Sequence, residues 1–119
     1  MNVSDNNFVL LSKLLDLTSA KNKVLANNIA NANTPGFKKF EVSFQDELQK
    51  AIESKDAEKM KNLKESITLS RDKSTTQDGN NVDLEKELVT FYQMTDRYNI
   101  YVELLSKKFK GIISAIEGR

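Results

Sequence analysis

Residues 84–117 read LEKELVTFYQMTDRYNIYVELLSKKFKGIISAIE, a long stretch without proline. Large apolar side chains recur in it in alternating steps of four and three residues, with charged side chains between them. This spacing places the apolar positions along one stripe of an α-helix, like the a and d positions of a heptad repeat. Asp83 is a suitable N-cap and Gly118 a suitable end, so we predict one long amphipathic helix. The stripe consists of Leu84, Leu88, Phe91, Thr95, Tyr98, Val102, Leu105, Phe109, Ile112 and Ile116.

The N-terminal segment, residues 8–32, carries a weaker copy of the same pattern. Two polar residues, Thr18 and Asn22, interrupt its apolar stripe. A polar side chain at such a position lowers stability but can fix the register and the number of partners. We therefore predict a second long helix that pairs with the first. Its stripe consists of Leu11, Leu15, Thr18, Asn22, Leu25, Ile29 and Ala32.

The length of the C-terminal helix decides the overall architecture. A helix of about 33 residues is roughly 50 Å long, whereas a compact chain of this size has a radius of gyration of only about 13–14 Å. Two overhanging helices can bury their stripes against each other in a hairpin. Apolar side chains outside the stripe would then stay exposed and require neighbours. These side chains are Val89, Tyr92, Met94, Ile100, Tyr101, Leu104 and Ile113.

Between the two helices the sequence becomes more polar. Residues 40–44 alternate as a strand does and precede a short helix, residues 55–66 form a solvated helix or a connector, and residues 67–71 (ITLSR) suit a short strand. Residues 72–81 (DKSTTQDGNN) have the composition of a loop. We expect one domain of a mainly α fold, its long helices paired as a coiled-coil-like hairpin. Its parts are an N-terminal helix and turn (1–37), a short middle segment (38–80) and a C-terminal helix (81–119).

Composition excludes several classes of function. The chain of 119 residues has 18 basic and 17 acidic side chains, so no net field favours nucleic acid. It has no cysteine and no histidine, the residues that most often serve as nucleophile, general base or metal ligand. Residues 1–7 lack the features of a cleaved signal peptide, and no apolar run is long enough for a membrane span. We expect no catalytic residue, cofactor, metal or small-molecule substrate.

Asparagine is concentrated where the first helix should end, in residues 27–38 (NNIANANTPGFK). Asn31 or Asn33 could take the left-handed conformation that ends a helix, and Gly36 can supply a positive φ in the turn after Pro35. Asn27 and Asn28 lie a turn inside the helix. Amide groups are unfavourable there unless a partner accepts their hydrogen bonds. We expect that partner to be another subunit.

The sequence LANNIANANTPGFKKFEVSFQDEL (residues 25–48) resembles the N-terminal signature of bacterial flagellar axial proteins, the family of rod and hook subunits. Residues 78–116, which begin DGNNVDLEKEL, resemble the matching C-terminal segment, and the short chain is most similar to subunits of the proximal rod. The resemblance implies a structural subunit of the basal-body rod, exported by the flagellar type III system without a cleaved signal peptide. Its terminal helices would pair as a coiled coil in the inner layer of a helical tube.

The resemblance also implies partners and a location. The chain would bind copies of itself, other rod proteins, and the inner-membrane ring and rod-adaptor components of the basal body. It would lie in the periplasmic rod and serve motility, with no role in binding nucleic acid. We assign the assembly interface to the helix stripes and the asparagines. This set is Leu11, Leu15, Asn22, Leu25, Asn27, Asn28, Ile29, Leu84, Leu88, Phe91, Tyr98, Val102, Leu105, Phe109 and Ile112.

A short motif follows the turn at residues 34–38. Phe44 and Leu48 have the form Phe-x-x-x-apolar, which occurs by chance in many amphipathic helices, where both side chains simply face the core. In rod and hook subunits this place carries a segment read by the type III export gate, so the resemblance implies that role for Phe44 and Leu48.

Two other classes of function fit the helices alone. The chain could be a soluble helical adaptor or chaperone that binds a partner through its apolar stripes, or a small helical enzyme. An adaptor should be well folded and of defined stoichiometry by itself. A rod subunit should be poorly ordered until it assembles, so the behaviour of the isolated chain separates the two.

Overall fold

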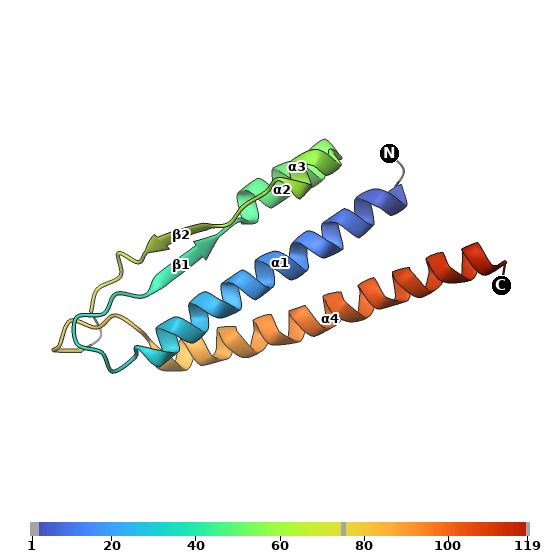
Figure 1. Cartoon of the computed structure of the whole chain (residues 1–119). Helices are drawn as coiled ribbons and strands as arrows, with labels where there is room; N and C mark the ends of the chain where they lie inside the picture. Colours follow the sequence, from blue (N-terminus) through green and yellow to red (C-terminus); the bar gives the residue numbers. More distant parts are fainter. Residues whose placement is uncertain (1–2, 75, 119) are drawn as a thin grey trace.

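Two long helices lie side by side and antiparallel along most of the molecule (Figure 1). The computed structural model describes residues 3–74 and 76–118. The predicted mainly α fold, with its terminal helices paired as a hairpin, is confirmed. In chain order the elements are α1 (Val3–Ala30), β1 (Phe40–Ser43), α2 (Gln45–Ser54), α3 (Ala57–Lys61), β2 (Ser66–Leu69) and α4 (Leu84–Glu117).

The C-terminal helix α4 has the boundaries that its sequence predicts. The Asp83 side chain accepts a hydrogen bond from Lys86 N, and Gly118 closes the helix in the left-handed conformation with φ 73°. The molecule is elongated, 64 × 27 × 14 Å with a radius of gyration of 18.0 Å, as expected if the helices overhang a compact core. The C-terminal end of α4 extends past the start of α1 (Figure 1).

The end of α1 differs from the prediction. Neither Asn31 nor Asn33 adopts a positive φ, and Lys55 is the one residue other than glycine that does so in the described part of the chain. The helix instead ends in tight turns, in which Asn31 N donates to the carbonyls of Asn27 and Asn28. Gly36 does supply a positive φ, 74°, and its N–H donates to Asp78 O at 2.8 Å.

The middle segment forms a thin second layer on α1, on the side away from α4 (Figure 1). Strands β1 and β2 pair antiparallel, with Phe40 opposite Leu69 and Val42 opposite Ile67. The short helices α2 and α3 connect them, and α3 packs on α1. The strands that the sequence suggested are therefore present as a small two-stranded sheet. Among the described residues no helix is both long and apolar enough to cross a membrane.

Candidate assembly surface

The contact between α1 and α4 is rotated relative to the stripe that the sequence predicts. Leu17 and Leu25 of α1 and Met94 of α4 are almost fully buried. Met94 lies outside the predicted stripe, so its assignment as an exposed position was wrong. The face turned to α1 shares Phe91 with the predicted stripe, but it also passes through Glu87 and Met94, which lie outside the stripe.

As a result, six of the ten stripe residues on α4 are exposed in the single chain, and Ile116 is the most exposed of them at 80%. The exposed fractions are 44% for Leu84, 38% for Tyr98, 42% for Val102, 48% for Phe109 and 46% for Ile112. The other stripe residues assigned to the interface are half-buried, apart from buried Leu25. They are Leu11, Leu15, Asn22, Ile29, Leu88, Phe91 and Leu105.

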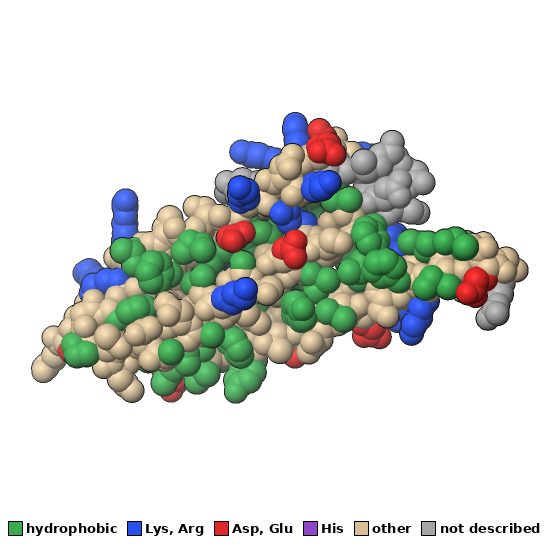
Figure 2. Space-filling view, in the orientation of Figure 1, with side chains coloured by type: hydrophobic (Ala, Val, Ile, Leu, Met, Phe, Trp, Pro, Cys, Tyr) green, Lys and Arg blue, Asp and Glu red, His purple; other side chains and the backbone are tan. Residues whose placement is uncertain are grey.

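A second set of apolar side chains is exposed on other faces of α4. Figure 2 shows hydrophobic side chains along the visible face of the molecule, including its narrow end. A monomer that exposes this much apolar surface on one helix presents a surface for other protein chains. The second set comprises Val89, Tyr92, Ile100, Leu104 and Ile113.

Asn28 uses its amide inside the chain. It is 1% exposed, its Nδ2 donates to Phe40 O at 2.8 Å and to Glu87 Oε2 at 3.1 Å, and Phe40 N donates to its Oδ1 at 2.9 Å. The amide thus pairs with Phe40 as the backbone of a neighbouring strand would. We based the interface assignment of Asn28 on a missing internal partner, and that premise was wrong. Asn27, in contrast, is exposed.

Two further asparagines, which sequence reasoning treated as loop, hold the turn at residues 31–38 to the start of α4. Asn80 Nδ2 donates to the carbonyl oxygens of Asn31 and Thr34 at 2.8 and 2.9 Å. Asn81 Oδ1 accepts from Lys39 N at 2.7 Å, and its Nδ2 donates to Asp72 O at 3.1 Å. Both are at most 2% exposed. We call residues 28–40, 70–74 and 76–87 the tip. The signal in the sequence that could have revealed it is the pair of asparagines directly before apolar Val82.

An ion pair stabilises the outside of the tip. Lys39 Nζ lies 3.0 Å from Asp72 Oδ2. The hydrogen bond and the charge of Lys39 hold the pKa of Asp72 below its ordinary value. Because the Asp72 side chain is largely exposed, solvent screening keeps the contribution of this pair to stability small.

Asn22 marks a polar interruption between the long helices. Its Nδ2 donates to Thr95 Oγ1 at 3.2 Å, whereas its buried Oδ1 accepts no hydrogen bond from any residue that the structure describes. A shallow crevice of about 280 Å³ adjoins it, lined by Ser19, Asn22, Lys23, Ala26 and Tyr98. A buried acceptor without a donor destabilises the single chain.

Phe44 and Leu48 lie at the first turn of α2. Phe44 occupies the N-cap position without a capping side chain, and Leu48 N donates to Phe44 O at 2.9 Å. Both side chains are half-buried in the folded chain. A receptor that reads both side chains fully would therefore need this segment unfolded.

Across the described residues no three His, Cys, Asp or Glu side chains gather in a way that could hold a metal ion.

Comparison with known proteins gives consistent matches. A family model described as flagella basal body rod protein matches residues 15–38. The chain is 35% identical to the flagellar basal body rod protein FlgB of Bacillus subtilis (strain 168), over 91% of each chain. It is 31% identical to the protein of the same name from Borrelia hermsii, over 94% of this chain and 96% of the relative. The protein of that name from Aeromonas hydrophila is 28% identical over 96% and 95%.

Proposed function

The chain belongs to the FlgB family of flagellar basal body rod proteins and is a structural subunit of the rod, and we propose that its exposed helix stripes hold it among copies of itself and other rod proteins in the proximal rod. Members of this family are structural proteins, so we assign the chain no catalytic role. In this proposal it lies in the periplasmic part of the basal body and also contacts inner-membrane ring and rod-adaptor components.

The observation that carries the assembly role is the exposed stripe on α4. Val102, Phe109 and Ile112 lie on one side of the helix and are each more than 40% exposed. Burying these side chains against neighbours would contribute roughly 25 cal/mol per Å² of apolar area. A contact that repeats without closing gives a tube or filament, the geometry that a rod requires.

An adaptor that binds one partner would also use an apolar stripe. The exposed apolar side chains, however, occupy several faces of α4, including Ile100 and Leu104 away from the stripe. Several contact faces on one helix suit a subunit surrounded by neighbours better than an adaptor with a single partner. The family membership favours the same choice.

The assembly role is tested by placing a charge on the exposed stripe. We expect Ile112→Asp to leave the helicity and stability of the isolated chain nearly unchanged, because Ile112 is exposed there. It should abolish rods and motility, because an unpaired carboxylate at a packed interface costs several kcal/mol. Asn99→Asp is the matched control, since Asn99 is exposed near Asp96 and Glu103 on a polar face. Normal rods with Ile112→Asp would contradict the assignment of this stripe.

We propose further that Phe44 and Leu48 are read by the flagellar type III export gate while the chain is unfolded. Phe44→Ala should then accumulate in the cytoplasm, whereas Ile112→Asp should still be secreted. Gln49→Ala is the control within α2, because Gln49 is exposed. Secretion is measured by immunoblots of medium and cell fractions. Should Phe44→Ala be secreted normally yet fail to assemble, Phe44 is a packing residue and not an export signal.

A further inference from the structure

The two edges of the small sheet differ in whether their backbone groups have a partner within the chain. At the β1 edge, the Asn28 side chain pairs with both backbone groups of Phe40. At the β2 edge no third strand is present among the described residues, and all four residues of β2 are exposed. The side chains of Ile67 and Leu69 are 51% and 57% exposed. An open apolar edge strand is a template for pairing with another chain.

The register of the sheet shows which backbone groups face this edge. Ser70 N donates to Lys39 O at 2.9 Å, and Phe40 lies opposite Leu69. Hydrogen-bonded and non-hydrogen-bonded pairs alternate in an antiparallel ladder. The N–H and C=O groups of Ile67 and Leu69 therefore point away from β1 to the open edge. An extended chain placed there could form hydrogen bonds with both residues.

The sequence of this edge is complementary to itself when reversed. Residues 64–72 read KESITLSRD, so a twofold axis through Thr68 places Ile67 opposite Leu69 of a second copy. In the same register Glu65 stands opposite Arg71, and therefore each flank pairs opposite charges. Ile67 and Leu69 then form hydrogen-bonded pairs, which is the arrangement that their outward backbone groups require.

We propose that two folded copies of this chain dimerise through β2, antiparallel and centred on Thr68, to give a four-stranded sheet. The apolar side of the sheet, made by Phe40, Val42, Ile67 and Leu69, then continues from one copy to the other. The two β1 strands lie about 14 Å apart, three strand spacings, so an α1 helix of about 10 Å diameter fits under each.

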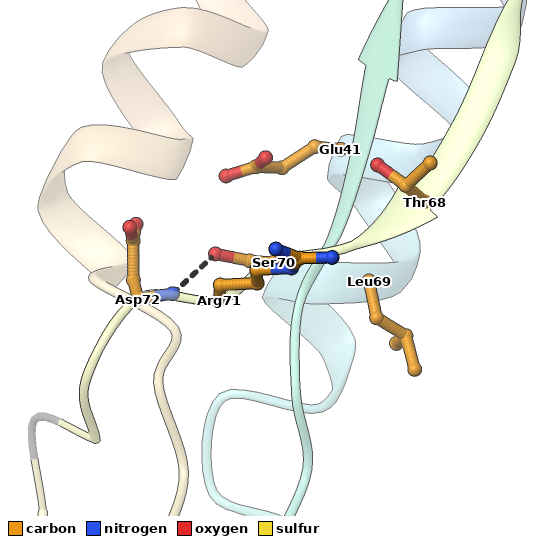
Figure 3. A pocket seen from close by; sticks show the side chains of 6 residues that line it. All are labelled: Glu41, Thr68, Leu69, Ser70, Arg71 and Asp72. Atoms are coloured by element: carbon orange, nitrogen blue, oxygen red, sulfur yellow. Dashed lines mark hydrogen bonds between the residues drawn. The ribbon is translucent and has the colours of Figure 1, made fainter.

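This surface differs from the helix stripes that we propose for the rod. A twofold contact closes after two copies and adds no third, whereas a rod grows by contacts that do not close. The dimer is therefore a state of the unassembled folded chain. It covers the apolar edge without allowing unlimited growth of a sheet. In the single chain a hollow of about 730 Å³ lies beside the strand and is lined by Glu41 and residues 68–72, which include Arg71 (Figure 3).

A single introduced thiol tests the register, because the natural chain has no cysteine. Thr68 faces itself across the axis in a non-hydrogen-bonded pair, where Cα atoms lie about 4.5 Å apart, within reach of a disulfide. Thr68→Cys should give a covalent dimer on mild oxidation. Ser66→Cys is the matched control on the same exposed strand, since its two copies would lie roughly 13 Å apart. Equal cross-linking of the two variants, or none, overturns the proposal.

Charge reversal provides an independent test. Glu65→Arg alone places two like charges at each flank, as does Arg71→Glu alone. Mixing the two single variants restores opposite charges at both flanks, so the mixture should dimerise at least fivefold more tightly than either variant. A short edge contact is a weak interface, so dimerisation should be followed by analytical ultracentrifugation at roughly 0.1–1 mM. Equal association of the mixture and of its components contradicts the proposed register.

Discussion

The tip and the far part of α4, from Val102 onward, differ in where their side chains find partners. At the tip, buried Asn28, Asn80 and Asn81 find hydrogen-bond partners within the chain. Along the far part, α4 leaves Val102, Phe109 and Ile112 exposed, and Ile116 is 80% exposed. The difference teaches that one end of the molecule is complete as a folded unit, whereas the other requires neighbours.

The largest expected effect is at the tip. Asn28→Ala leaves the N–H and C=O of Phe40 and the carboxylate of Glu87 without the amide, so we expect it to lower the free energy of unfolding by about 3–5 kcal/mol. Urea denaturation followed by circular dichroism measures this. Asn27→Ala is the control and should cost less than about 0.5 kcal/mol, because Asn27 is exposed. Equal effects of the two variants would mean that the tip is not held by Asn28.

A smaller effect is expected from comparing two apolar residues of α4. Met94→Ala should lower the free energy of unfolding of the isolated chain by about 2–3 kcal/mol, because Met94 is 6% exposed against α1. Ile112→Ala should lower it by less than about 1 kcal/mol, because Ile112 is 46% exposed. Thermal or urea unfolding of both variants decides this. A larger loss for Ile112→Ala would place the intrachain contact on the predicted stripe after all.

The smallest effect concerns acid. The depressed pKa of Asp72, caused by its hydrogen bond and charge contact with Lys39, contributes stability above the ordinary carboxyl range. That contribution is lost as the pH falls below about 4 and Asp72 becomes protonated. Asp72→Asn should therefore be slightly less stable than the natural chain at pH 7 and equal to it near pH 2. A difference that persists at pH 2 would show that the Asp72 side chain contributes by something other than its charge.

The sequence predicted the helices well because their signals are local and repeated. The α4 helix has an N-cap at Asp83, a glycine at its end and an unbroken apolar period. The rotation of α4 against α1 was not predictable, because Met94 and nine of the ten stripe residues are apolar, and only the packing decides which of them are buried. The tip was missed for a similar reason, since Asn28 and Asn80 are joined only by the fold, each to backbone groups of distant segments.

Hydrogen exchange of the isolated chain at micromolar concentration tests the difference between the two ends most directly. With Asn28 and Met94 buried inside the chain, we now expect poor order before assembly only in the far part of α4 and not, as the sequence suggested, in the whole subunit. We predict strong protection of backbone amides where α1 and α4 meet the tip, at residues 24–30 and 87–95. Protection should decline along α4 and be weak at residues 105–117, because the apolar side chains there are largely exposed and few contacts within the chain hold the helix. Uniform protection along the whole of α4, or stronger protection at residues 105–117 than at the tip, would contradict the account.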